Sequence, residues 1–278
     1  MTEILQYDFF RNALLGVTVI SVASAIIGTY IVTRRLVAIS GGITHACFGG
    51  LGLGYFLGVN PVVMAALVAI GASAGVEWMS TRHRIRHDSA IAVVWALGMA
   101  VGIIFVFMTP GYVPELNSFL FGNVLTITEG DIWSFVAFTV VLVAFMSVFY
   151  RQVVACAFDS DFARVMNLRV RMVNYSMTVL TAVCIVLTIR LVGVMLLMSM
   201  LALPQIIAEI YFHRFRSMML ASVAITITGC VAGLFMSAAS DVPCSAIMVM
   251  TLLVMYVIAR VAAPLFRRRN KDASRSVN

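Results

Sequence analysis

The sequence contains almost no lysine and no closely spaced pair of cysteines. Of its 19 lysine and arginine residues, only Lys271 is a lysine. A glycine-rich loop that binds nucleotide phosphates needs a lysine in its middle, so the chain has no P-loop ATPase motif. The five cysteines are irregularly spaced and form no CxxC pair, which argues against a disulfide framework or a structural zinc site. We interpret them as small apolar packing residues.

Charged residues are also scarce, at 11% of the chain, whereas a soluble domain has about 25%. Hydrophobic residues make up 62%, and the mean hydropathy is +1.03. These values exclude an ordinary soluble enzyme, a disordered chain and a nucleic-acid binder. They predict an all-α polytopic membrane protein, with one transmembrane domain over residues 1–265 and a basic polar cytoplasmic tail over residues 266–278.

Long apolar runs predict nine segments of about the length that spans a bilayer. Pro204 lies inside the seventh segment and predicts either an interrupted helix or a simple proline kink there, so we expect eight or nine spans. The nine segments are Ala13–Val32, Ile39–Gly58, Pro61–Met79, Ser89–Met108, Ile132–Phe149, Val173–Ile189, Leu191–Phe212, Met218–Ala239 and Cys244–Leu265.

The arginines predict the orientation of the chain in the membrane. Apart from Arg11 and Arg190, all the basic residues fall on one side of an alternating arrangement of spans. The positive-inside rule makes that side cytoplasmic. We therefore expect the N-terminus outside and the C-terminus in the cytoplasm.

His45 lies in the second segment, within a stretch of seven glycines between residues 41 and 58. Glycine lets helices approach closely in a membrane, so we expect a tightly packed, central helix. The imidazole is either hydrogen-bonded to a neighbouring helix or a ligand for a borderline divalent metal. We interpret Met195, Met198 and Met200, like the other methionines, as packing residues. Glu77 and Glu209 are interpreted as interfacial residues near the cytoplasmic ends of their helices, and Asp241 as a turn residue.

The segment over about residues 155–171 is too polar to span a membrane and has a helical pattern. Asp159 or Ser160 is suited to cap a short helix, and Asn167 to end it in the left-handed conformation. Phe162, Val165 and Met166 share one face. This predicts a short cytoplasmic helix that either rests on lipid or docks into a groove of a cytosolic partner.

Five blocks of the sequence together resemble the permease subunits of metal-ion ABC importers, which move zinc, manganese or iron. In chain order the blocks are AISGGITHACFGGLGLGYFLG, ELNSFLFGNVLTIT, FDSDFARVMNLRV, LVGVMLLMSMLALP and SAASDVPCSAIMV. The resemblance implies a multi-pass permease of the bacterial cytoplasmic (inner) membrane that is not itself an enzyme. The implied partners are a second permease copy, two cytosolic ATPase subunits that bind ATP, and an extracytoplasmic metal-binding protein.

The resemblance also implies roles for particular residues. His45 and Asp241 would contact the transported divalent metal ion, and no cofactor would be bound by this chain. The segment from Phe158 to Val170 would transmit ATPase movement into the membrane. The residues implied in this coupling are Phe158, Asp159, Phe162, Ala163, Arg164, Asn167 and Leu168.

One position departs from the family pattern. The family usually has an aspartate four residues before the histidine, one helical turn away, and this chain has Gly41. An oxygen ligand is therefore missing, and the identity of the metal stays open. The alternative function is a gradient-driven secondary metal transporter or channel, which the proline in the seventh segment and the intramembrane His45 would suit.

Overall fold

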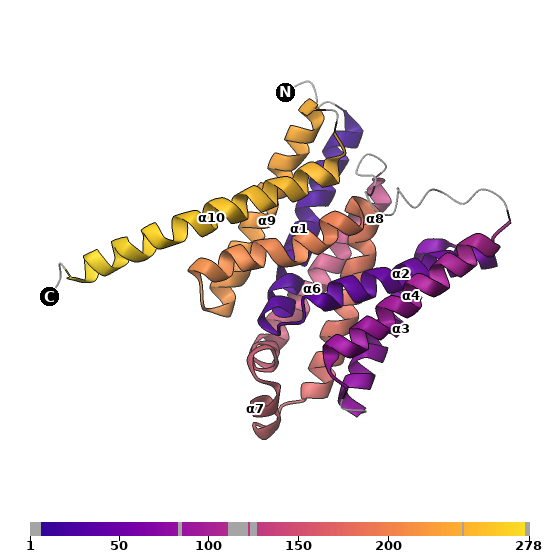
Figure 1. The fold of residues 1–278 in the computed structure, drawn as a ribbon, viewed down its shortest axis with the longest axis horizontal. Coiled ribbons are helices and arrows are strands. Elements are labelled where there is room, and N and C mark those ends of the chain that lie inside the picture. Colours follow the sequence, from indigo (N-terminus) through magenta and orange to yellow (C-terminus); the bar gives the residue numbers. More distant parts are fainter. Residues whose placement is uncertain (1–6, 83–84, 111–121, 123–126, 241, 276–278) are drawn as a thin grey trace.

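The computed structural model describes residues 7–82, 85–110, 122, 127–240 and 242–275, with side chains up to residue 264. The described residues form a bundle of helices without strands (Figure 1). The helices are α1 (Asp8–Thr33), α2 (Ala38–Leu57), α3 (Pro61–Arg82), α4 (His87–Met108), α6 (Glu129–Phe158), α7 (Ser160–Val165), α8 (Val170–Tyr211), α9 (Phe215–Ser240) and α10 (Cys244–Arg275).

The prediction of an all-α polytopic bundle is confirmed. Each of the nine predicted segments lies in a helix, and the sixth and seventh both belong to α8. Seven of the described helices are long and apolar enough to cross a membrane. The helix α2 is not among these seven, because its glycines and His45 make it less apolar, yet it packs against α3 and α4.

The long helix α8 is interrupted at Gly193, not at Pro204 where the sequence predicted the break. Gly193 has φ 75° and ψ 176°, a conformation that essentially only glycine adopts. Gly122 approaches this point so closely that a Cβ on Gly122 would overlap the backbone of Val192 and Gly193. The interruption therefore lies where a glycine permits it and where a second glycine packs against it.

Pro204 stays inside the second half of α8 because a side chain replaces the hydrogen bond that proline cannot make. Without an N–H, Pro204 leaves the carbonyl oxygen of Met200 without its helical donor. Nε2 of Gln205 donates to that oxygen at 3.2 Å. The break predicted from the proline alone is thereby avoided.

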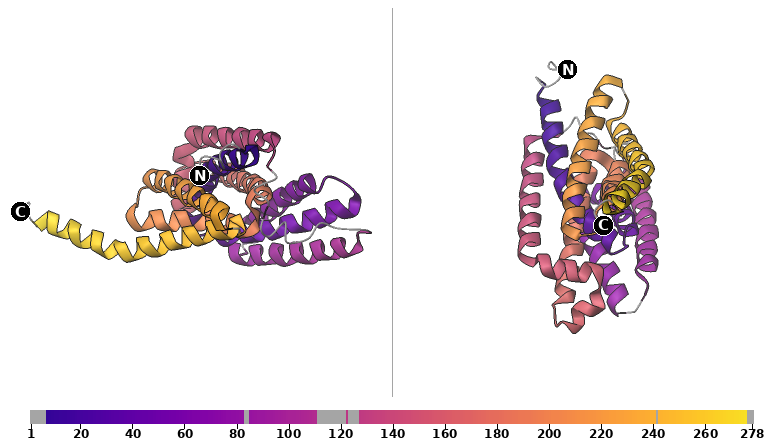
Figure 2. Two further views of the ribbon diagram at one scale, coloured as in Figure 1. Left: turned by 90° about the horizontal axis from the view of Figure 1, so that it is seen from above. Right: turned by 90° about the vertical axis from the view of Figure 1, so that its left-hand side faces the viewer.

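The arrangement of the helices separates a buried centre from an exposed periphery. Most of α1 and α8 is buried, whereas α4 and the spanning part of α10 are largely exposed. The helix α10 projects away from the other helices (Figure 2). The start of α1 and the helix α7 lie at opposite ends of the molecule (Figure 1), so we name these the N-terminal end and the α7 end.

Candidate functional site

The helices α2 and α4 meet backbone to backbone along a row of glycines, which we call the α2–α4 seam. A Cβ added to Gly49 would lie 2.8 Å from the carbonyl oxygen of Gly98. A Cβ on Gly98 would lie 2.6 Å from Cα of Ala46, and Gly52 faces Gly102 in the same way. The sequence prediction that α2 is tightly packed is confirmed.

His45 lies beside this seam and contacts two side chains of α4. Its ring stacks on the indole of Trp95, with 4.5 Å between the ring centroids and 16° between the planes. Nδ1 of His45 lies 3.1 Å from Sδ of Met99. His45 as a whole is partly exposed. Neither Trp95 nor Met99 was predicted as a site residue, because their approach to His45 depends on how α4 packs on α2.

The position one turn before His45 is also surrounded by soft and aromatic groups. A Cβ on Gly41 would lie 3.1 Å from Cε of Met198 and 3.1 Å from Cζ3 of Trp95. Met198 comes from the half of α8 that follows the break at Gly193. Side chains of α4 and α8 thus surround this position of α2.

The second predicted metal contact, Asp241, lies outside the described residues. Among the residues that the structure does describe, no group of three or more histidine, cysteine, aspartate or glutamate side chains is arranged to hold a metal ion. A closed coordination shell of these residue types is therefore absent from the described part of the chain. Methionine sulfur is a further donor type, and the structure brings it next to His45.

The short helix predicted within residues 155–171 is present as α7, with the predicted caps. Oδ1 of Asp159 accepts hydrogen bonds from the backbone N–H groups of Asp161 and Phe162, at 3.0 Å and 2.9 Å. Asn167 has φ 57°, the left-handed conformation that ends the turn. The N–H of Leu168 donates to the carbonyl oxygen of Ala163 at 3.1 Å. Both local predictions, the cap and the left-handed asparagine, are confirmed.

One residue of α7 is fully buried. The apolar stripe of this helix, in contrast, faces outward. Ala163 has no exposed surface and holds α7 against the bundle. Phe162, Val165 and Met166 are 58%, 84% and 60% exposed. Arg164 pairs with Asp161 at 2.9 Å on the surface. Of the other residues implied in coupling, Phe158 is exposed and Leu168 is partly buried against the core.

A polar recess adjoins α7. Its volume is about 620 Å³, and it lies between the end of α1, the end of α6 and the turn from α8 to α9. Arg34, Arg35, His213 and Glu209 line it, together with Phe158 at the end of α6 and Ser160 at the start of α7. The α7 end therefore offers an exposed apolar helix beside a hollow with charged side chains of both signs.

Glu77 is buried rather than interfacial, which corrects its interpretation from the sequence. Only 3% of Glu77 is exposed. Nδ2 of Asn174 on α8 donates to Oε1 of Glu77 at 3.4 Å, and the hydroxyl of Tyr30 on α1 donates to Oδ1 of Asn174 at 3.4 Å. Arg34 donates to the same hydroxyl at 2.8 Å. The carboxylate is thus part of a polar chain that joins α3, α8 and α1.

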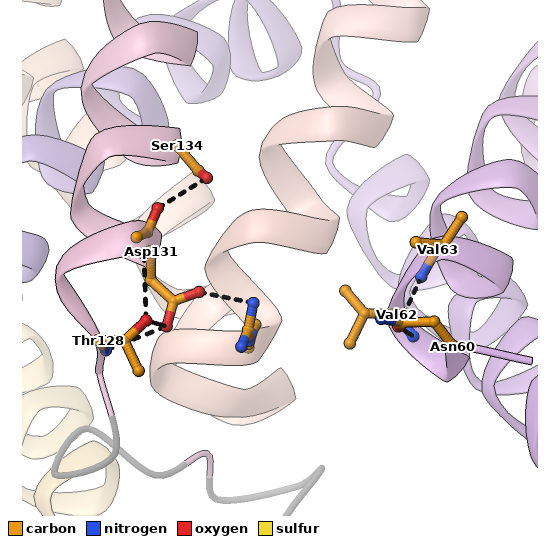
Figure 3. A network of polar contacts seen from close by, with 8 residues as sticks. Asn60, Val62, Val63, Thr128, Asp131 and Ser134 are labelled. Carbon is orange, nitrogen blue, oxygen red and sulfur yellow. Dashed lines mark hydrogen bonds and ion pairs between the residues drawn. The ribbon is translucent and has the colours of Figure 1, made fainter.

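At the N-terminal end, α6 and α8 are joined by an ion pair that the sequence did not predict. Asp131 is nearly buried, and its Oδ1 lies 2.6 Å from Nη1 of Arg190. The other carboxylate oxygen of Asp131 accepts from the N–H and the hydroxyl of Thr128, forming a capping box at the start of α6 (Figure 3). Arg190 lies three residues before Gly193, so the pair holds α8 next to its interruption.

Comparison with known proteins places this arrangement in a family. The sequence matches the ABC 3 transport family over residues 6–263. It is 31% identical over 259 residues to an uncharacterized membrane protein of Synechocystis sp., covering 93% of this chain and 92% of that protein. It is 27% identical to the manganese import system permease protein ScaB of Streptococcus parasanguinis, covering 96% of this chain and 95% of that one.

A solved structure has the same fold. A chain of PsaBC from Streptococcus pneumoniae in complex with Fab superposes with a TM-score of 0.81 at 24% identity, covering 93% of each chain. The helical arrangement is therefore that of a fold already known from this solved structure. Since the family match spans nearly the whole sequence, the chain belongs to the ABC 3 transport family.

Proposed function

We propose that this chain is the translocating subunit of an ATP-driven importer of a divalent metal ion, with zinc, manganese and iron as the candidate cargoes. Cytosolic ATPase subunits would dock on α7, and an extracytoplasmic metal-binding protein would deliver the ion at the N-terminal end. A second copy of the chain would complete the translocation path. The complex would lie in the bacterial cytoplasmic membrane, with the N-terminus outside and α7 in the cytoplasm.

The exposed apolar stripe of α7 is the observation on which the proposal depends. An amphipathic helix that docks in a groove presents apolar anchors at helical spacing. Phe162, Val165 and Met166 have that spacing, and more than half of each side chain is exposed. Asp159 caps the helix and Ala163 anchors it, so the stripe is presented on a fixed support.

His45 supports the transport part of the proposal. A polar side chain within a membrane span is costly unless it contacts protein or a water-filled path. His45 is partly exposed beside the α2–α4 seam, where the backbones leave no room for a side chain. A rigid support with one accessible imidazole suits a transient contact for a passing cation.

Reconstitution separates the proposal from a gradient-driven carrier or channel. The chain is placed in proteoliposomes with and without its ATPase, and uptake of zinc, manganese and iron is measured. We expect uptake only with the ATPase and ATP, and no effect of an ionophore. Full-rate uptake by the chain alone, or uptake that collapses with the ionophore, would show a secondary transporter or channel instead.

The docking role of α7 is tested by placing a charge in its apolar stripe. We expect Phe162→Asp to abolish co-purification of the ATPase while the chain stays folded, because a buried unpaired carboxylate at the interface is costly. Phe9→Asp is the matched control, since Phe9 is also an exposed aromatic, 43% against 58%, but lies near the N-terminus. Stoichiometric ATPase binding by Phe162→Asp would contradict the proposal.

A further inference from the structure

A groove between α6 and α9, which we call the α6–α9 groove, opens on the outer surface of the bundle. Its volume is about 380 Å³. The two helices both pack against α1 and flank it (Figure 2), so α1 forms the floor. All three helices are long and apolar enough to cross a membrane, so the groove lies at the depth of lipid acyl chains. We propose that it binds an anionic phospholipid, with an acyl chain in the groove and the phosphate group on Arg216.

The interior of the α6–α9 groove is apolar. Ile26 of α1 and Met146 of α6 form its base, and both are almost completely buried. Val143 and Met219 stand beside them as walls. None of the described residues that line the groove is acidic. Because a bilayer core holds no water to fill such a hollow, an acyl chain there regains the van der Waals contacts that an empty space forfeits.

The polar end of the groove is the end nearer to α7. Arg216 lies in the first turn of α9, and the start of α9 borders the recess beside α7. Tyr150 lies two helical turns beyond Val143 on α6, toward the same end, a distance of about 10 Å. Tyrosine and arginine are typical of the headgroup level of a membrane, and apolar side chains of its interior. The groove therefore has the same order of polarity as a phospholipid, from headgroup to acyl chain.

Arg216 is free to bind a phosphate group. Its side chain is exposed and forms no ion pair or hydrogen bond with any residue that the structure describes. The same is true of Arg151, which follows Tyr150, and of Arg214 in the turn before α9. A guanidinium group binds phosphate oxygens through two parallel hydrogen bonds. Because these positive charges are not neutralised within the described residues, a headgroup with a net negative charge is favoured over a zwitterionic one.

An aromatic contact joins the two sides of the polar end. The ring of Tyr150 meets the ring of Phe215 edge-on, with 6.1 Å between the centroids. Phe215 is 4% exposed and directly precedes Arg216, so the contact holds the start of α9 beside α6. The hydroxyl of Tyr150 makes no hydrogen bond within the part of the chain that the structure describes. It is therefore a second donor for the phosphate group that Arg216 binds.

Native mass spectrometry of the purified chain tests the headgroup. The probes are phosphatidylglycerol and phosphatidylcholine with identical acyl chains, offered in equal amounts. We expect phosphatidylglycerol to be retained about fivefold more, and Arg216→Gln to lower its retention about fivefold. Arg171→Gln is the control and should change nothing, because Arg171 is also exposed and unpaired but does not line the groove. Equal retention of the two lipids, or full retention of phosphatidylglycerol by Arg216→Gln, would overturn the proposal.

Filling the groove distinguishes a lipid from a free phosphate ion. Ser147 lines the groove and is exposed, so Ser147→Trp places an indole in the space of the acyl chain without disturbing buried residues. We expect this variant to retain about fivefold less phosphatidylglycerol, and inorganic phosphate not to displace the lipid from the parent chain. Ser134→Trp is the matched control, since Ser134 is an exposed serine of α6 outside the groove. Equal retention by the two variants, or displacement by inorganic phosphate, would contradict the role of the acyl chain.

Crosslinking tests whether a second copy of the chain covers the groove instead. Ser147→Cys places a thiol at the groove in membranes that contain phosphatidylglycerol. We expect no disulfide-linked dimer beyond the level of the parent chain, because lipid lies against this position. A high yield of dimer through residue 147 would show that the groove is an interface between two copies, and the lipid site would then be refuted.

Discussion

The α2–α4 seam and the helix α7 use side-chain size in opposite ways. Along the seam, Gly49 and Gly98 remove side chains so that two backbones touch. On α7, large apolar side chains such as Phe162 and Val165 stand uncovered at the surface. Packing along the seam is already complete within one chain, whereas the stripe on α7 has no covering within the described residues. The seam joins two helices of the chain, and α7 leaves an apolar surface exposed.

The largest effect is expected from filling the seam. Gly98→Leu would drive a side chain into the backbone of Ala46, which lies 2.6 Å from the position of the Cβ, so we expect a loss of about 3 kcal/mol or more of unfolding free energy. Thermal unfolding of the detergent-solubilised chain measures it. Gly71→Leu on α3 is the control, because no atom lies within 4 Å of its Cβ position. Equal stability of the two variants would show that the seam is not a rigid contact.

A smaller, local effect is expected from removing the cap of α7. Asp159→Ala deletes the acceptor of two backbone hydrogen bonds and should cost about 1 kcal/mol, confined to α7. Hydrogen exchange at Asp161 and Phe162 should become faster while the core is unchanged. Asp159→Asn keeps the acceptor and serves as the control. Faster exchange throughout the bundle would mean that α7 is part of the core rather than a separate support.

The smallest effect is expected from the stripe itself. Val165→Ser changes a side chain that is 84% exposed, so the unfolding free energy should stay within about 0.5 kcal/mol. Val153→Ser on α6 makes the same change at a fully buried position and should cost about 2 kcal/mol. Chemical denaturation compares the two. A large loss from Val165→Ser would mean that the stripe is packed within the chain after all.

Much of the fold could be predicted because it depends on local composition. The apolar runs mark the nine helical segments, and Asp159 and Asn167 mark the start and end of α7, since capping involves residues close in the sequence. Gly193 was harder to foresee than Pro204. A proline in the sequence indicates that one backbone hydrogen-bond donor is missing. The hydrogen bond that replaces it comes from the side chain of Gln205, and the sequence does not show where that side chain lies.

Only part of the candidate site could be predicted from the sequence. His45 was found because an imidazole is rare inside a span. Met99 resembled one more packing residue until α4 was placed against α2, and Asp131 and Arg190 gave no sign of pairing across 59 positions. Residues far apart in the chain become neighbours through helix packing, and neither periodicity nor spacing encodes such contacts.

The repair of Pro204 has a consequence for how the sequence can change over time. The side chain of Gln205 lies against Gly28 of α1, where a Cβ would overlap it and would also come within 2.7 Å of the carbonyl oxygen of Leu201. The amino acids tolerated at Gly28, Pro204 and Gln205 therefore depend on one another. A larger residue in place of Gly28 would displace the amide of Gln205 from the carbonyl oxygen of Met200. That carbonyl oxygen would then have no donor, and Pro204 would have to be replaced as well.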